Sequence, residues 1–346
     1  MLFPCDTLTR HCQSLDGVWR LAFDGKRIGI DRKYFLRPPS DTEDIAVPSS
    51  INELVSERSR YLNMDWVWYF RDFYVPAEWM SRRVFLHFGS ATHRAEVFLN
   101  GRRLGGHEGG FLPFEFELTD RVHADRPNRL AVRVDNLLSA RTVPQGGLNP
   151  KLGGVAAWRP ETLPDVHYDH FPFMGLHRPV TLYSTGRARI ENLRLTTLSL
   201  KAKSACVRIE GDFSGEADTL VASCAELGFE QRIGLKGPTF DRTASLTGIV
   251  PWSPETPRIY DIELTLLADG QPLDHYVLPF GLRTIKVARG KLLLNGRAVF
   301  LRGFGRHEDA AIHGKGQSLP HIVKDHNLLR WVGANSFRTS HYPYSE

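Results

Sequence analysis

Apolar and polar residues alternate with a period of two along most of the first 280 or so residues. The segment RVFLHFG places Val84, Leu86 and Phe88 on one side, and RLAVRVDN repeats the pattern with Leu130 and Val132. A period of two is the spacing of side chains that share one face of a β-strand. The pattern predicts strands that bury one face in a core and leave the other in water.

Short turn signals separate the predicted strands. Asn100-Gly101, Asp269-Gly270 and Asn295-Gly296 each follow an apolar run, and such pairs tolerate the positive φ angles of tight hairpins. Many short strands without intervening helices favour a jelly roll or a β-sandwich. We therefore expect a mostly β fold.

The alternation breaks near residues 185–188 and resumes at Ile190. We interpret residues 1–186 as a jelly-roll domain. Residues 187–283 have the size of one immunoglobulin-like β-sandwich. The two segments are predicted to fold around separate cores.

The pattern changes again after residue 283. AVFLRGFG (298–305) is nearly all apolar, which is typical of a strand buried on both faces. Ser318 can cap a helix that runs to about residue 333, and a second strand starts at Asn335. Strand, helix and strand over 284–346 indicate the beginning of a TIM barrel. A complete barrel takes about 250 residues, so we expect the chain to be a fragment of a longer protein with an incomplete barrel.

Composition excludes several classes of protein. The net charge of +5 comes from 44 basic and 39 acidic residues that are interspersed, whereas nucleic-acid binders gather their basic residues into a stripe. No apolar run approaches the roughly 20 residues of a membrane helix, and the first residues do not resemble a signal peptide. We expect no nucleic-acid or membrane partner and a cytoplasmic location. The four cysteines form no C-x-x-C pair and need not be bridged.

Three stretches carry the polar residues of interest: YDHFPFMGLHRPVTLYS (168–184), GFGRHEDAAIHGKG (303–316) and RTSHYPY (338–344). The last two follow the predicted barrel strands, and barrel active sites form at the carboxyl ends of strands. RHEDAAIH is not an H-E-x-x-H zinc motif. We expect no metal there, although chelation by this loop stays open.

These stretches, together with LDGVWRLAFD, VWYFRDFYVP, LHFGSATHRAEVFLNG and GANSFRTSHYPYSE, occur in an order that resembles the β-glucuronidases within glycoside hydrolase family 2. The resemblance implies a jelly-roll sugar-binding domain, an immunoglobulin-like sandwich and a (β/α)8 barrel. It also implies retaining, exo-acting hydrolysis of terminal β-linked glucuronic acid by two glutamates, whose carboxyl groups lie about 5–5.5 Å apart.

The resemblance places both catalytic glutamates beyond residue 346, and neither Glu308 nor Glu346 matches their positions. The residues that recognise the uronate carboxylate are likewise expected further along the barrel. We therefore expect the chain by itself to be inactive. The resemblance implies no cofactor, a small glycoside substrate, and a homo-oligomer, often a tetramer, for the complete protein.

Four residues match substrate contacts or supports of the family. Asp169 corresponds to an aspartate that reaches into the sugar pocket, and His341 to a histidine at the tip of the second strand; His307 is the other candidate for contact with sugar. Arg338 resembles an arginine that supports the charge of the nucleophile. Without the resemblance, Asp169 reads as a turn-capping residue, His341 as a structural histidine and Arg338 as a buried ion-pair partner.

Two other functions are compatible with this pattern. A β-galactosidase-type enzyme would share the domain plan. A non-catalytic carbohydrate-binding or assembly module would use the β domains alone.

Overall fold

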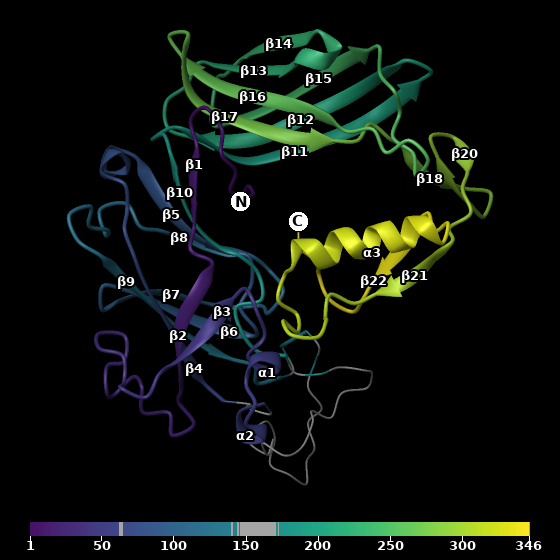
Figure 1. Cartoon of the computed structure of the whole chain (residues 1–346). Coiled ribbons are helices and arrows are strands. Elements are labelled where there is room, and N and C mark those ends of the chain that lie inside the picture. Colours follow the sequence, from purple (N-terminus) through teal and green to yellow (C-terminus); the bar gives the residue numbers. More distant parts are fainter. Residues whose placement is uncertain (62–64, 140, 144, 146–170, 172, 346) are drawn as a thin grey trace. The chain divides into compact units, whose positions relative to one another are not determined.

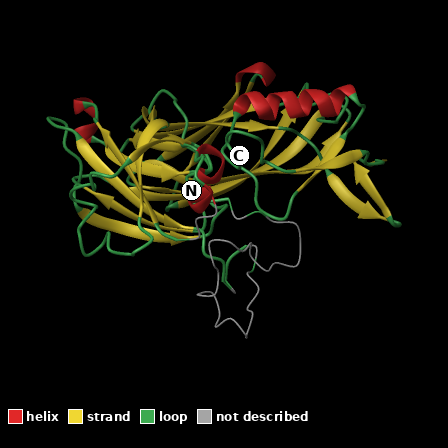
Figure 2. Ribbon diagram, turned by 60° about the horizontal axis from the view of Figure 1, so that its bottom comes forward, coloured by secondary structure: helices red, strands yellow, loops and turns green. Residues whose placement is uncertain are grey.

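A computed structural model describes residues 1–61, 65–139, 141–143, 145, 171 and 173–345. Strands account for 47% of the described residues and helices for 9%, and the predominance of strands is plain in Figure 2. The expectation of a mostly β fold is confirmed.

The contacts divide the chain into two compact units. One contains residues 1–12, 183–304 and 327–337, and the other contains residues 13–182, 305–326 and 338–346. The predicted domain boundaries at 186/187 and 283/284 stay predictions.

The first sandwich consists of two antiparallel sheets (Figure 1). The six-stranded sheet has the order β3 (Glu43–Val47), β2 (Gly17–Phe23), β4 (Val67–Phe73), β9 (Asn128–Asp135), β6 (Arg94–Leu99), β7 (Arg102–Glu108). The four-stranded sheet has the order β1 (His11–Ser14), β10 (Val180–Thr185), β5 (Arg83–Phe88), β8 (Phe114–Glu117). Among the described residues, three short helices accompany them: α1 (Ile51–Leu54), α2 (Arg58–Tyr61) and the 3-10 helix η1 (Ala77–Ser81).

The core of this sandwich contains the residues that the alternation singled out. Val84, Leu86 and Phe88 of β5 face Leu130 and Val132 of β9 within one buried cluster. The outer face of β4 is buried as well, because Tyr34 and Phe35 of a preceding loop partly cover Trp68 and Phe70. The period-two prediction is thus right for the inner face and misses the covered outer face.

The second sandwich belongs to the other unit and has two sheets of its own. One has the order β11 (Arg189–Lys201), β12 (Ser204–Ser214), β15 (Thr239–Thr247), and the other β14 (Phe229–Gly234), β13 (Thr219–Cys224), β16 (Tyr260–Ala268), β17 (Gln271–Phe280). A single 3-10 turn, η4 (Ala225–Leu227), precedes β14. Seven strands in sheets of three and four are the plan of an immunoglobulin-like domain.

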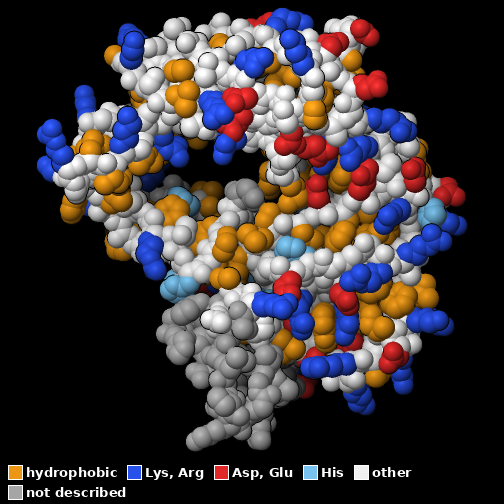
Figure 3. Space-filling view, turned by 180° about the vertical axis from the view of Figure 1, so that it is seen from behind, with side chains coloured by type: hydrophobic (Ala, Val, Ile, Leu, Met, Phe, Trp, Pro, Cys, Tyr) orange, Lys and Arg blue, Asp and Glu red, His pale blue; other side chains and the backbone are white. Residues whose placement is uncertain are grey.

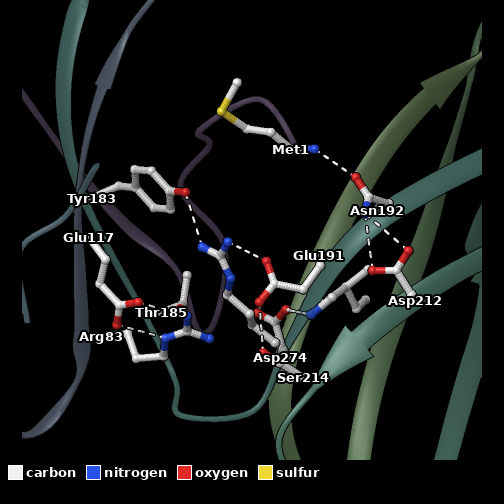
Figure 4. Close-up of polar contacts among 12 residues, drawn as sticks. Met1, Arg83, Glu117, Tyr183, Thr185, Glu191, Asn192, Asp212, Ser214 and Asp274 are labelled. Atoms are coloured by element: carbon white, nitrogen blue, oxygen red, sulfur yellow. Dashed lines mark hydrogen bonds and ion pairs between the residues drawn. The ribbon is translucent and has the colours of Figure 1, made fainter. Parts of the chain in front are cut away.

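Hydrogen bonds and ion pairs fasten the start of β11 to its surroundings (Figure 4). Arg189 donates to the Tyr183 hydroxyl at 3.1 Å and pairs with Glu191. Glu191 also accepts a bond of 2.7 Å from Ser214. The backbone N–H of Ile190 donates to Asp274 at 2.8 Å, so the buried Asp274 carboxylate helps to join β11 to β17.

The predicted tight turns are confirmed by their backbone angles. Asn100 and Gly101 have φ values of 50° and 79° between β6 and β7. Asp269-Gly270 joins β16 to β17, and Asn295-Gly296 joins β19 to β20. In both pairs the two residues also have positive φ values. Positive φ at both central residues is the signature of the hairpin turn that these dipeptides favour.

The last segment contains two small sheets and one longer helix. Its elements are β18 (Ile285–Ala288), β19 (Lys291–Leu294), β20 (Arg297–Ala298), β21 (Gly303–Arg306), α3 (Leu319–Trp331) and β22 (Ser336–Thr339). The helix begins after Ser318, and Gly333 has a φ of +76° just beyond its end, as predicted. The described residues contain no closed barrel, in agreement with the expected incomplete one.

The strand predicted over 298–305 is wrong in extent and in burial. Only Gly303–Arg306 forms β21, and Phe300 is 80% exposed. The physical reason is that β21 pairs with β22 alone, and most side chains of this two-stranded sheet are exposed. Trp331 of α3 is 82% exposed as well.

The β18–β20 sheet also presents apolar side chains to solvent. Val287 is 78% exposed between exposed Lys286 and Arg289, and blue and orange side chains mix on this lobe at the left edge of Figure 3. All four cysteines are described, and none of them is bridged. Among the described residues, no helix combines the length and apolar character needed to cross a membrane.

Candidate functional site

The carboxyl ends of β21 and β22 lie together. Ahead of the strands, the Asn335 N–H donates to the Arg302 carbonyl at 2.9 Å, and after them Ser340 Oγ lies 3.2 Å from His307 Nε2. Contacts at both ends mean that the two strands run parallel. This topology places His307 and His341, each just beyond a strand, at one edge of the sheet.

The two histidine rings face each other edge-on. Their centroids are 5.8 Å apart with an interplanar angle of 81°. His307 Nδ1 lies 3.5 Å from Asp309 Oδ1, and the His307 side chain is 45% exposed. Both imidazoles are therefore accessible, and their ring nitrogens can donate or accept hydrogen bonds from hydroxyl groups of a ligand.

Tyr342 anchors the second strand end on the first sandwich. Its ring stacks on Phe111 at a centroid distance of 4.6 Å, and its hydroxyl accepts a bond of 3.0 Å from the Glu308 N–H. Burial raises the pKa of the Tyr342 hydroxyl, so it stays protonated. One aromatic residue thus joins both strand-end loops.

Arg178, which precedes β10, also contacts these loops. This buried guanidinium donates to the Phe111 carbonyl at 2.8 Å and the Pro343 carbonyl at 2.7 Å. It also lies 3.5 Å from Glu308 Oε2. Glu308 is therefore the charge partner of a buried cation, and the expectation that it is no catalytic glutamate stays a prediction.

The loop between β21 and α3 is held by hydrogen bonds to Ser50. The Ser50 N–H donates to the His313 carbonyl at 3.0 Å, and the Lys315 N–H donates to Ser50 Oγ at 2.9 Å. Gly314 has a φ of +54°, and a Cβ on it would lie 2.5 Å from the Ser50 side chain. Only glycine satisfies both constraints.

His177 contacts Ser50 as well and is a neutral imidazole. Its Nε2 lies 3.1 Å from Ser50 Oγ and its Nδ1 lies 2.8 Å from Thr92 Oγ1. Burial, with a smaller contribution from the charge of Lys315, lowers the pKa of His177 well below its ordinary value. A neutral ring at this position bonds two hydroxyl groups without adding a buried charge.

A cavity of about 60 Å³ lies beneath the strand-end loops. Its lining includes Arg178, His307, Asp309, Lys315 and His321. Ligand pockets usually measure about 300–1,000 Å³, so this cavity has room for water and not for a sugar ring. A sugar bound by His307 and His341 would therefore lie outside this cavity, where the two histidine side chains are exposed to solvent.

The remaining sequence predictions have different outcomes. Asp169 lies outside the described residues. Arg338 lies on β22 and is exposed in this chain, so the alternative of a buried ion-pair partner within a closed barrel stays a prediction. Its supporting role stays a prediction, as do the sugar contacts of His307 and His341. Within the described residues, no group of three or more potential metal ligands occurs.

Sequence reasoning missed Arg178, Tyr342 and Lys315 as organisers of the loops. Lys315 could have been noticed, because it stands between two glycines in HGKGQ, a pattern that indicates close approach of the backbone to a neighbour. Arg178 and Tyr342 had no comparable local signal.

Comparison with known families gives a continuous match. Residues 12–186 match the family model described as glycosyl hydrolases family 2, sugar binding domain. Residues 188–283 match the model described as glycosyl hydrolases family 2, and residues 285–346 match the TIM barrel domain of the same family. The chain belongs to glycosyl hydrolase family 2.

Several β-glucuronidases are similar to this chain. One from Paenibacillus borealis is 38% identical over 354 residues, and the alignment covers all of this chain and 58% of that protein. The human β-glucuronidase is 35% identical over 367 residues, with 56% of its length covered. A solved Ruminococcus gnavus β-glucuronidase in complex with D-glucuronic acid has a TM-score of 0.90 at 30% identity, with all of this chain and 58% of that chain covered. The family 2 chain described here thus spans under three fifths of the length of these relatives.

Proposed function

We propose that this chain forms the sugar-binding portion of a retaining, exo-acting β-glucuronidase that releases terminal β-linked glucuronic acid from conjugates. The observation that carries the proposal is the convergence of two accessible histidines at the carboxyl ends of adjacent parallel strands, where barrel enzymes bind their substrates. The similarity to β-glucuronidases along the whole chain supports it.

Each candidate residue has a distinct task in this proposal. His307 and His341 bond hydroxyl groups of the sugar ring, and Asp169 accepts bonds from two adjacent hydroxyls. Arg338 stabilises the negative charge of the nucleophile. The two catalytic glutamates and the groups that bind the uronate carboxylate are supplied by barrel residues outside this sequence, and no cofactor takes part.

The complete protein is proposed to be a cytoplasmic homo-oligomer, in keeping with the expectations from the sequence. Two alternatives are tested alongside the main proposal: a β-galactosidase-type enzyme, and a module that binds carbohydrate without catalysis.

Binding of methyl β-D-glucuronide to the 346-residue chain tests the proposed site. We expect a saturation-transfer NMR signal from the sugar. Replacement of both strand-end histidines, His307→Ala with His341→Ala, should weaken binding at least about tenfold, because each lost hydrogen bond is worth on the order of 1 kcal/mol.

The matched control is His326→Ala, which removes an exposed histidine of α3 and should leave binding unchanged. Tighter binding of methyl β-D-galactoside than of the glucuronide would favour the β-galactosidase-type alternative. Absence of binding by the folded wild-type chain, or full binding by the double variant, would overturn the proposed site.

A further inference from the structure

Lys315 is a buried cation among aromatic rings. Its side chain is 7% exposed, and Nζ lies 3.7 Å from the centroid of the Tyr342 ring, with Phe111 and Phe173 at 5.7 and 5.8 Å. A cation within about 6 Å of a ring face is attracted by its quadrupole. Burial of an ammonium group nevertheless opposes folding, so a functional use of the charge is the simplest account of its presence.

The contacts of this ammonium reach both strand-end loops. Nζ lies 3.8 Å from Asp309 Oδ1, the same oxygen that lies 3.5 Å from His307 Nδ1. On the other side it meets Tyr342, which directly follows His341. One charged group therefore touches a neighbour of each histidine.

We propose that Lys315 is a positioning residue for sugar binding, whose ammonium holds Asp309 and Tyr342 in place and thereby fixes the loops that carry His307 and His341. The inference rests on the function proposed above. The charge, and not the volume of the side chain, is the active feature, since an apolar residue of similar size would leave Asp309 without its cation. The backbone of Lys315 is held separately by Ser50.

The charged and titratable groups around Lys315 come from three segments. Asp309 and Glu308 of the loop after β21 favour its charged form, and Arg178, ahead of β10, disfavours it. His177 stays neutral, and Tyr342 stays protonated. Burial is the largest influence and lowers the pKa of Lys315 from 10.5 to about 8. The side chain is therefore mostly charged at pH 7 and mostly neutral at pH 9.

This titration moves stability and sugar binding in opposite directions. Between about pH 8 and 10.5 the unfolded chain still binds the proton that folded Lys315 has released. The contribution of Lys315 to the free energy of unfolding therefore rises with pH. Positioning by the ammonium predicts that affinity for the sugar falls over the same range. A purely structural lysine would not separate the two readouts.

The test is the affinity of the 346-residue chain for methyl β-D-glucuronide at pH 7 and pH 9, measured by saturation-transfer NMR titration. We expect wild type to bind about threefold to tenfold more weakly at pH 9, the range given by a cation–π contact of about 0.7–1.4 kcal/mol. Lys315→Arg keeps its charge at both values and should show a flat profile. Lys315→Met should bind weakly at both, and the exposed control Lys324→Met should behave as wild type.

The outcomes separate the inference from the proposed function. Equal wild-type affinity at pH 7 and pH 9, or full affinity in Lys315→Met, would overturn positioning by Lys315 while leaving the sugar site in place. No binding by wild type at either pH would instead remove the proposed function. The wild-type profile decides the question even if Lys315→Met does not fold.

Discussion

Replacing Arg10 by Met is expected to destabilise the unit that contains the second sandwich by about 3–5 kcal/mol. Arg10 and Asp274 form an ion pair of 2.6 Å with side chains 3% and 0% exposed. Asp274 also accepts bonds from Thr9 Oγ1 at 3.2 Å and the Ile190 N–H at 2.8 Å. Removal of the guanidinium leaves a buried carboxylate without its cation, which is the costly way to break such a pair.

Urea unfolding followed by circular dichroism measures this effect. The double variant Arg10→Met with Asp274→Leu should recover part of the loss, because it removes both charges but leaves the Ile190 N–H and the Thr9 hydroxyl without their acceptor. Arg20→Met is the matched control, since Arg20 pairs with Asp44 at the surface with side chains 50% and 67% exposed, and it should cost about 0–1 kcal/mol. A loss for Arg10→Met no larger than for Arg20→Met would show that the N-terminal segment is not fastened through this pair.

The second large effect is an absence of hydrolysis. The purified 346-residue chain should release no 4-nitrophenol above the blank rate from 4-nitrophenyl β-D-glucuronide or 4-nitrophenyl β-D-galactoside. A retaining mechanism needs a nucleophilic carboxylate and a separate carboxylic acid about 5–5.5 Å apart. The carboxylates next to His307 are Glu308 and Asp309, and each lies within 4 Å of a cation, Arg178 or Lys315.

Glu308→Gln and Asp309→Asn provide the control for this prediction. Any trace activity that survives in both variants belongs to a contaminant and not to these carboxylates. Turnover by wild type that disappears in either variant would contradict the expectation and would assign catalysis to this loop.

The parts of the fold that were predicted correctly depend on local sequence. Hairpin turns follow from dipeptides such as Asn100-Gly101, whose φ angles are decided by the residues themselves. The inner faces of β5 and β9 follow from alternation. Burial of the outer face of β4 could not be predicted, because it depends on Tyr34 and Phe35, which come from a distant loop.

The strand over 298–305 shows the reverse case. Its apolar residues indicated burial on both faces, yet burial requires neighbouring strands and layers, and β22 is the one strand that pairs with β21 among the described residues. Phe300 and Phe304 are consequently exposed. A hydrophobic pattern predicts what a segment can bury and not whether a partner is present.

The candidate site was predictable only in part. His307 and His341 followed from the expected strand ends and from the family resemblance. The support from Arg178 to the Pro343 carbonyl joins residues that are 165 positions apart, and no local pattern reports such a contact. The aromatic surroundings of Lys315 likewise need rings from three distant segments.

The most direct test is hydrolysis by a hybrid in which residue 346 is followed by the remaining C-terminal part of the Paenibacillus borealis β-glucuronidase, aligned in register. We predict turnover of 4-nitrophenyl β-D-glucuronide that falls about fivefold to tenfold in His341→Ala, as expected for a lost hydrogen bond to the substrate. A folded hybrid without turnover, or one that His341→Ala leaves unchanged, would contradict the assignment of this chain as the sugar-binding portion of a β-glucuronidase.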